Sequence, residues 1–245
     1  MTVSSGREKK PSAFRDPATV TRTRSNDDLV VESWHLNASP WTTAVRGNQI
    51  ESRTLVTNQA IVDAVLSRSP STVLDIGCGE GWLVRALSSR GIDAVGIDVV
   101  PELIEHAKQA GGGTFRVSSY EELIAAEAET RVDVAVANFS LIGKEPVERL
   151  VRGIPALLAP GGAFIVQTLH PITSCGDLPY EDGWRPGSWE GFGKEFSDPA
   201  PWYFRTLESW KRLLNEGGLR LIETREPSNP KTGKPASVIF VASAS

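Results

Sequence analysis

The sequence predicts an α/β fold, in which a mostly parallel β-sheet is covered by helices. Short apolar runs of strand length alternate with segments whose apolar residues recur at helical spacing. A glycine-rich turn joins the first such run to the helix that follows it, and turns of this kind mark the ligand edge of open α/β sheets. With 245 residues the chain can bury one sizeable core, so we expect a single domain.

The composition excludes several classes of function. The formal net charge is −4, from 26 Lys and Arg against 30 Asp and Glu, so nucleic acid is a disfavoured partner. Cys78 and Cys175 have neither the number nor the spacing of a disulfide framework or a metal site, and we expect no metal. No apolar stretch approaches the roughly 20 residues of a membrane span. We therefore expect a cytoplasmic protein without a membrane partner.

The chain is organised around residues 73–83, which read VLDIGCGEGWL. An expected strand at 71–76 runs into this turn, and helical spacing resumes after it. The three glycines lack a Cβ, so the backbone can adopt positive φ and approach a bound molecule closely. Asp75 adds a carboxylate, whose natural partner is a cation or a pair of hydroxyls. We interpret the turn as a ligand loop and not as a glycine-rich turn without a ligand.

Two nucleotide-binding motifs fit this turn poorly. Counting from Gly77 and Gly79, the third glycine of the dinucleotide fingerprint is replaced by Trp82, and no Gly-Lys-Ser/Thr triplet follows Gly81. The run D-x-G-x-G-x-G instead resembles the first signature of class I S-adenosylmethionine-dependent methyltransferases. The resemblance covers residues 70–243. It implies a Rossmann-like, doubly wound, seven-stranded sheet with an antiparallel last strand, and S-adenosyl-L-methionine as cofactor.

The N-terminal region divides into two expected parts. Residues 1–29 are polar and read as a mobile tail. Residues 30–69 have the spacing of two amphipathic helices and would form a lid over the cofactor end of the sheet. Trp41 and Arg53 are assigned to the cofactor site, and Arg46 shares this potential, because an arginine there could pair with the cofactor carboxylate. A solvated arginine face is the alternative.

The core that follows, residues 70–170, carries the expected cofactor residues. A second strand, 92–98, ends in an acid about 20 residues past the loop, where nucleoside-binding folds hold ribose hydroxyls. N-capping of the next helix, 101–110, is the alternative role for this acid. By resemblance, the turn after a third strand borders adenine, although it lacks the usual acid. The cofactor residues of this core are Asp75, Gly77, Cys78, Gly79, Trp82, Asp98, Val99, Ser119, Tyr120, Asn138 and Phe139.

Two further strand ends point to the acceptor side. A fourth strand, 132–137, is followed by Asn-Phe-Ser-Leu, and the lack of proline there argues against enzymes that methylate nucleic-acid amines. Phe139 would stack on a ligand or belong to the core. After a helix at 146–158, a fifth strand, 163–169, delivers His170 to the carboxyl edge of the sheet. His170 is the predicted catalytic and acceptor-contacting residue, acting as a base only if the acceptor arrives protonated. His35 and His106 are weaker candidates.

Residues 171–205 form an insertion after the fifth strand that is rich in aromatic residues. We expect it, as neither strand nor long helix, to cover the acceptor side, with plain core packing as an equal alternative. Its predicted substrate-binding residues are Trp184, Trp189, Trp202 and Tyr203. Residues 206–245 would then close the fold with a helix at 207–215 and a β-hairpin from strands at 219–224 and 236–241.

The sequence thus predicts methyl transfer from S-adenosyl-L-methionine to a small, flat aromatic or heteroaromatic acceptor, by N- or O-methylation. The stretch WYFRTLESW at 202–210 and the Trp-rich insertion resemble bacterial small-molecule methyltransferases, and this resemblance implies the narrower suggestion of specialised metabolism. Two other classes stay open. One is a methyltransferase-like protein that binds the cofactor without turnover, and the other, disfavoured by Trp82, is a nicotinamide oxidoreductase. Acceptor identity and oligomeric state do not follow from the sequence.

Overall fold

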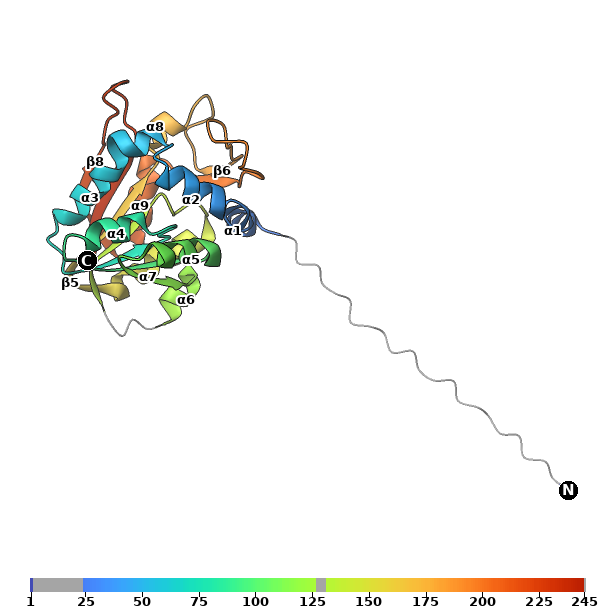
Figure 1. The fold of residues 1–245 in the computed structure, drawn as a ribbon, viewed down its shortest axis with the longest axis horizontal. Coiled ribbons are helices and arrows are strands. Elements are labelled where there is room, and N and C mark those ends of the chain that lie inside the picture. Colours follow the sequence, from blue (N-terminus) through green and yellow to red (C-terminus); the bar gives the residue numbers. More distant parts are fainter. Residues whose placement is uncertain (2–23, 127–130, 245) are drawn as a thin grey trace.

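The computed structural model describes residues 1, 24–126 and 131–244, and a seven-stranded sheet lies at the centre (Figure 1). The strand order is β3-β2-β1-β4-β5-β9-β8. Strands β1 to β5 run parallel, while β9 lies antiparallel between β5 and β8. The strands are β1 Thr72–Ile76, β2 Asp93–Asp98, β3 Thr114–Val117, β4 Val132–Asn138, β5 Leu158–Thr168, β8 Leu219–Arg225 and β9 Val238–Ala244. The predicted Rossmann-like sheet with an antiparallel last strand is confirmed.

Helices cover both faces of the sheet, as the long apolar runs of the central strands require, because strands buried on both sides cannot alternate with polar residues. One face packs against α3 Asn58–Leu66, α4 Trp82–Ser88 and α5 Pro101–Ala110. The other packs against α6 Tyr120–Ala125, α7 Glu145–Leu157 and α9 Leu207–Glu216. These helices bury an apolar stripe against the sheet, except α6, whose apolar residues are only partly buried. The order of the strands reverses between β1 and β4, where open α/β sheets bind ligands.

The N-terminal region differs from the prediction of two lid helices. Helix α1 Asn26–Leu36 begins within the range expected for the tail, capped by Ser25, and α2 Ala38–Arg46 follows. A π-helical turn, η1 Arg53–Thr57, leads into α3, which packs on the sheet and not over its edge. Only α1 and α2 therefore form the lid. The remainder of the predicted tail, residues 2–23, lies outside the described residues.

Four short elements, α6, α8, β6 and β7, were not predicted from the sequence. Helix α6 is held by a capping box between Ser119 and Glu122, two residues whose spacing carried the signal. In the insertion, α8 Pro171–Ser174 precedes a two-stranded antiparallel sheet, β6 Gly183–Arg185 and β7 Trp202–Phe204, where no strand was expected. The amide of Tyr203 donates to the carbonyl of Ile142 (2.8 Å), which fixes this small sheet to the loop after β4.

Candidate functional site

Two adjoining cavities lie at the carboxyl edge of the sheet. The first cavity is formed by the loops after β1, β2, β3 and β4 together with the lid, and the second by the ends of β4 and β5, the η1 turn and the insertion. Their volumes are about 190 and 460 Å³. The walls that they share are Trp34, Trp41, Arg53, Phe139 and Ile142.

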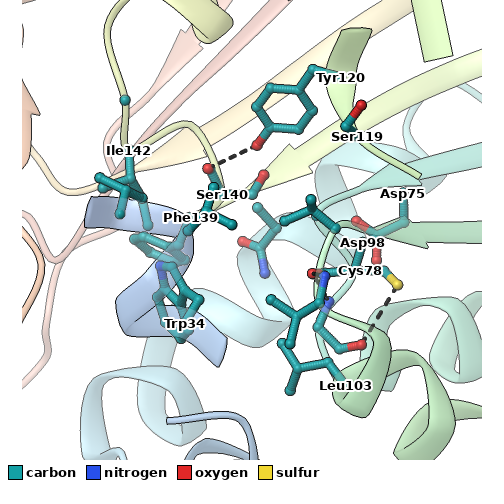
Figure 2. Close-up of a pocket in the computed structure, with 18 of the residues that line it drawn as sticks. Trp34, Asp75, Cys78, Asp98, Leu103, Ser119, Tyr120, Phe139, Ser140 and Ile142 are labelled. Atoms are coloured by element: carbon teal, nitrogen blue, oxygen red, sulfur yellow. Dashed lines mark hydrogen bonds between the residues drawn. The ribbon is translucent and has the colours of Figure 1, made fainter. Parts of the chain in front are cut away.

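The structure brings every residue predicted for the cofactor to the first cavity (Figure 2). These are Trp41, Arg53, Asp75, Gly77, Cys78, Gly79, Trp82, Asp98, Val99, Ser119, Tyr120, Asn138 and Phe139. They come from separate segments of the chain, so their convergence follows from the fold alone.

The glycine loop needs its glycines for two different reasons. Gly77 has a φ of +75°, and a Cβ there would lie 2.4 Å from the Cβ of Ser140. Gly79 also has positive φ, at +57°, and a Cβ added to it would have the indole nitrogen of Trp41 as its nearest neighbour, at 3.7 Å. The amides of Gly77 and Cys78 both donate to the carbonyl of Ile97 (2.8 and 2.9 Å). The loop is therefore fixed by backbone contacts and leaves space only above Gly79.

Asp98 organises the end of β2. One carboxylate oxygen accepts from the amide of Gly79 (2.9 Å) and the other from the amide of Val100 (2.9 Å). Burial raises the pKa of Asp98, while the hydrogen bonds from the backbone oppose that rise. The N-cap position of α5 is Val100, and no side chain caps the helix. Asp98 thus links the glycine loop to the start of α5. It does not occupy the N-cap position of this helix, which was the alternative role that the sequence left open.

Asp75 is buried, and one of its carboxylate oxygens, Oδ1, has no hydrogen-bond partner among the residues that the structure describes. Burial, together with the nearby Asp98, raises the pKa of Asp75 to about 8 against the opposing influence of Arg53. An unpartnered buried acceptor is costly unless something donates to it. The amide oxygen of Asn138, which lines the same cavity, is also buried and unpartnered. The two oxygens together would suit a ligand that donates several hydrogen bonds.

Arg53 stands on the π-helical turn η1, a geometry often found at functional sites. Its guanidinium lies 5.6 Å from the ring centroid of Trp41 and 5.1 Å from that of Trp82. Its Nε donates to Asn58 (3.2 Å), while one terminal nitrogen, Nη2, has no partner. Burial lowers the pKa of Arg53 to about 10, against the opposing influence of Glu80 and Asp75, so the side chain stays charged at neutral pH.

The end of β4 forms the wall between the cavities. Phe139 has a φ of +55°, a conformation that is strained for a bulky residue. Its amide donates to the carbonyl of Gln167 on β5 (2.8 Å), which holds the strained residue in place. The next residue, Ser140, donates to the carbonyl of Ile76 (2.6 Å) and accepts through its own carbonyl from the hydroxyl of Tyr120 (3.0 Å; Figure 2).

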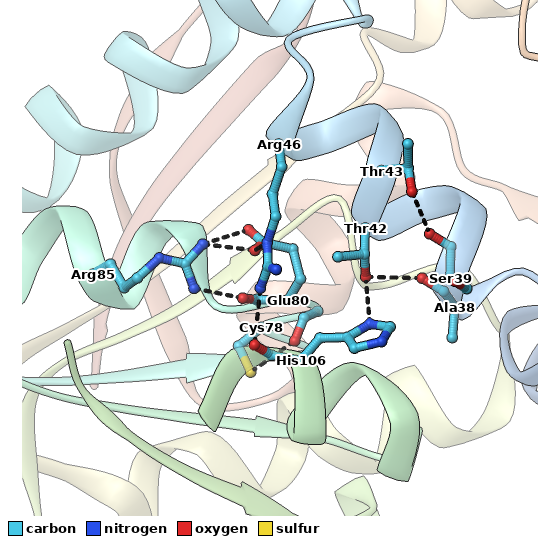
Figure 3. A network of polar contacts seen from close by, with 10 residues as sticks. Ala38, Ser39, Thr42, Thr43, Arg46, Cys78, Glu80, Arg85 and His106 are labelled. Atoms are coloured by element: carbon cyan, nitrogen blue, oxygen red, sulfur yellow. Dashed lines mark hydrogen bonds and ion pairs between the residues drawn. The ribbon is translucent and has the colours of Figure 1, made fainter. Parts of the chain in front are cut away.

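A polar network fixes the lid to the glycine loop (Figure 3). The buried carboxylate of Glu80 pairs with Arg46 of α2 (2.8 Å) and with Arg85 of α4 (2.6 Å). Arg46 also donates to the carbonyl of His106, whose ring contacts the hydroxyl of Thr42 (2.9 Å). Arg46 is absent from the lining of both cavities, so the role considered for it at the cofactor is replaced by a role in lid attachment. His106 likewise lies against the lid and not on a solvated face.

The lid is joined to the insertion as well. The side chain of Asn37 donates to the carbonyl of Ser197 (2.8 Å) and accepts from its amide (3.0 Å), while Ser33 donates to the carbonyl of Asp198 (2.6 Å). Rings add to this contact, since Trp34 packs edge-on against Trp189 with centroids 5.9 Å apart. The lid and this part of the insertion therefore form one cover.

Nine of the 25 residues that line the second cavity are aromatic. Of the predicted acceptor residues, Trp189, Trp202 and Tyr203 line it. Trp184 does not, because it packs edge-on against Tyr203 from outside with centroids 5.4 Å apart. Arg205 also lines this cavity and was not singled out from the sequence, where a lone arginine after an aromatic run gives no signal. Burial lowers the pKa of Arg205.

The structure does not bring His170 to either cavity. Its neighbours Leu169 and Pro171 line the second cavity, but the imidazole is buried on the other side, with Nε2 3.6 Å from a carboxylate oxygen of Glu226. Neither ring nitrogen has a hydrogen-bond partner. The direction of the side chain at a strand end depends on the twist and on the turn into α8, which the sequence pattern does not reveal.

Sequence reasoning also missed Trp34, which lines both cavities. Its signal was a spacing of two helical turns from Trp41, although the two residues stand on separate helices, α1 and α2, where their ring centroids lie 5.1 Å apart. Among the described residues there is no cluster of His, Cys, Asp or Glu that could hold a metal ion. Within the same residues, no helix has the length and apolar character needed to cross a membrane.

The first cavity fits the amino-acid and sugar parts of S-adenosylmethionine. Unpartnered carboxylate and amide oxygens on Asp75 and Asn138 are acceptors for an ammonium, and the free nitrogen of Arg53 is a donor for a carboxylate. Above Gly79, where there is space, Asp98 presents a buried carboxylate for hydroxyls. Burial raises the pKa of the Cys78 thiol, so this residue lines the cavity as a neutral group and not as a nucleophile.

Comparisons with known proteins agree with this geometry. A family model described as a methyltransferase domain matches residues 53–224. An uncharacterized methyltransferase of Schizosaccharomyces pombe is 28% identical over 178 residues, which are 69% of this chain and 67% of that protein. The ubiquinone biosynthesis O-methyltransferase of Xanthomonas axonopodis is 32% identical over 114 residues, but the match spans only 44% of this chain and 47% of that protein.

Solved structures give the same fold at lower identity. The glycopeptide N-methyltransferase MtfA, solved in complex with S-adenosyl-L-methionine, superposes with a TM-score of 0.59 at 13% identity, covering 76% of this chain and 86% of that chain. Since the family model spans well over half of the sequence, and since the cavity is built as that cofactor requires, the chain belongs to the class I S-adenosylmethionine-dependent methyltransferases.

Proposed function

We propose that this enzyme transfers a methyl group from S-adenosyl-L-methionine, held in the first cavity, to a small, flat aromatic or heteroaromatic acceptor held in the second. The observation that carries the proposal is the shared wall, in which Trp34, Trp41, Arg53, Phe139 and Ile142 line both cavities. Two sites that meet in this way allow one reacting atom from each ligand to approach the other.

The proposed contacts to the cofactor follow the polar atoms of the first cavity. Asp98 accepts from the ribose hydroxyls, Asp75 and Asn138 accept from the ammonium, and Arg53 donates to the carboxylate. The backbone of Gly77, Cys78 and Gly79 lies against the ligand, with Trp41 and Trp82 holding Arg53. Val99, Ser119, Tyr120 and Phe139 form the remaining wall, toward the adenine.

The contribution of the protein to catalysis is mainly positioning. When bound, the cofactor supplies a methyl group activated by a positively charged sulfur. Aromatic side chains orient a flat acceptor and exclude water, which favours in-line approach at close distance. None of the chain's three histidines lines either cavity, so the proposed chemistry needs no histidine base, and His170 keeps no role at the acceptor.

The relatives do not decide which atom is methylated. One is an O-methyltransferase of ubiquinone biosynthesis, and one structural neighbour is a glycopeptide N-methyltransferase. The second cavity is walled by Trp189, Phe192, Trp202 and Tyr203. An aromatic wall favours a flat acceptor, whether nitrogen or oxygen takes the methyl group. We also propose that the enzyme acts in specialised metabolism and in the cytoplasm.

Two measurements test the proposal. Calorimetry should detect micromolar binding of S-adenosylhomocysteine and no binding of NADH, and the reverse would favour the oxidoreductase. Transfer of radiolabelled methyl groups should then be measured over a panel of phenols, aromatic acids, amines and azaheteroaromatics. Transfer to none of them, in a protein that binds S-adenosylhomocysteine, would favour the alternative of a cofactor-binding protein without turnover.

A further inference from the structure

The second cavity has an unusual balance of charge. Of the described residues that line it, none is Asp, Glu, Lys or His, and the charged ones are Arg53 and Arg205. Its other polar lining groups are hydroxyls, amides and indoles. An ammonium moved into such a cavity would lose its hydration without gaining a carboxylate partner. An anion, by contrast, would find two guanidinium groups, which bind carboxylates through charge-assisted hydrogen bonds.

Arg205 is the cation that the acceptor meets. Arg53 lines both cavities, and the proposed function pairs it with the cofactor carboxylate. Arg205 lines only the second cavity. The guanidinium of Arg205 is buried and stacks over Tyr203 and Trp210, 4.7 and 5.1 Å from their ring centroids. Its position is thus fixed by aromatic residues that border the same cavity.

The hydrogen bonds of Arg205 leave part of its donor capacity unused. Its two terminal nitrogens donate to the carbonyls of Gly143 (2.9 Å) and Lys144 (3.1 Å). A guanidinium carries more N–H groups than these two bonds use. Arg205 also pairs with the partly exposed carboxylate of Glu148, 3.9 Å away, and the carboxylates of Asp182 and Asp27 act on it from beyond ion-pair distance. The ammonium of Lys144 lies 5.5 Å from the ring centroid of Tyr203 and adds positive charge near that ring.

We infer that the acceptor is an aromatic acid, a flat ring system with a carboxylate or an equivalent oxyanion, and that Arg205 recognises its charge. This inference rests on the proposed function and narrows its acceptor class. It also predicts discrimination against aromatic amines in their ammonium form, whichever atom of the acceptor is methylated.

The test uses the full chain saturated with S-adenosylhomocysteine, so that the first cavity is filled. Binding of three probes of similar shape is measured by calorimetry at pH 7: 2-naphthoate, 2-naphthamide and 2-naphthylmethylammonium. We expect the carboxylate to bind at least threefold more tightly than the amide and at least tenfold more tightly than the ammonium. Equal or tighter binding of the ammonium, or no binding of the carboxylate, overturns the inference.

Variants then locate the preference. Arg205→Gln should lose at least threefold of the carboxylate-to-amide ratio, and Arg205→Lys should keep most of it. Arg152→Gln, which removes one exposed charge from α7, is the matched control and should change nothing. An unchanged ratio in folded Arg205→Gln overturns the role of Arg205. If Arg205→Gln does not fold, the probe series on the natural chain still decides the acceptor class. Failure of S-adenosylhomocysteine to bind would instead refute the proposed function.

Discussion

The two cavities are built in different ways, although they share a wall. In the first cavity the backbone of the glycine loop is fixed, because Gly77 and Cys78 are held by a carbonyl of β2 and Gly79 by the carboxylate of Asp98. The second is formed by side chains that meet from the lid, the η1 turn and the insertion. A site built on fixed backbone tolerates few substitutions. A site built from packed aromatic side chains can be altered by substituting one side chain at a time.

The sharpest way to break the first cavity is Gly77→Ala. The new Cβ would lie 2.4 Å from that of Ser140, at a φ of +75°. We expect a loss of unfolding free energy of about 1–3 kcal/mol from strain alone, together with loss of measurable S-adenosylhomocysteine binding. Denaturant unfolding and calorimetry measure the two effects.

Gly91→Ala is its matched control. Gly91 has a similar φ of +82°, but nothing lies within 4 Å of a Cβ there. It should show backbone strain with normal cofactor binding. Normal binding in Gly77→Ala would mean that the loop can move away from Ser140, contrary to a rigid backbone site.

Asp98→Ala should affect the first cavity and spare the second. Loss of hydrogen bonds to a charged group should weaken S-adenosylhomocysteine binding by roughly 1.5–3 kcal/mol. Calorimetry measures this loss, and Asp93→Ala, which removes an exposed acid from the same strand, is the control. Affinity unchanged from the natural chain would remove the ribose assignment of Asp98.

The pH dependence of stability probes the buried acid Asp75. Its pKa in the folded protein is about 8, raised by burial above the unfolded value, so the folded state keeps a proton that the unfolded state releases. Stability from this group is full below the unfolded pKa of about 4, and is lost as pH rises toward about 8. The steepest loss is about 1.4 kcal/mol per pH unit.

Asp75→Asn should remove that slope. Urea unfolding of both proteins without ligand, from pH 5 to pH 9, compares them directly. Parallel curves for the two proteins would show that Asp75 ionises normally and that the polar end of the first cavity is more hydrated than its burial indicates.

The smallest expected effect concerns the second cavity. Trp189→Ala removes one aromatic wall and should weaken binding of 2-naphthoate by about 0.5–1.5 kcal/mol, with S-adenosylhomocysteine affinity unchanged. Trp184→Ala is the control, because Trp184 packs outside the cavity. If Trp184→Ala weakened probe binding more than Trp189→Ala, the assignment of the cavity wall would be wrong.

The same contrast explains what the sequence could predict. The sheet and its antiparallel last strand were predicted from the resemblance to the methyltransferase family that D-x-G-x-G-x-G carries, and the ribose position of Asp98 was predicted from its spacing after the glycine loop. His170 and Trp184 were placed in the acceptor site by position along the chain, and neither lines it. A side chain beyond a strand end, or in an irregular segment, takes its direction from tertiary packing, to which local spacing is blind.

The lid shows the same limit. Two lid helices were expected over residues 30–69, yet α3 packs on the sheet. Its apolar residues belong to the same buried cluster as apolar residues of the central strands. Amphipathic spacing identifies a buried stripe but not the surface that buries it. From the sequence, both Arg46 and Arg53 had the potential to pair with the cofactor carboxylate. In the structure Arg46 pairs instead with the buried Glu80.

The paired contact of Asn37 with Ser197 has an evolutionary consequence. The side chain of Asn37 donates to and accepts from the main chain of Ser197, so this contact does not depend on which side chain stands at position 197. Hydrogen bonds between neighbouring strands are independent of the side chains in the same way. Mutations in the surrounding loop can therefore change the rings that face the acceptor while the loop keeps its register. Related enzymes could therefore acquire new substrates through substitutions in this one loop, while the residues that bind the cofactor stay unchanged.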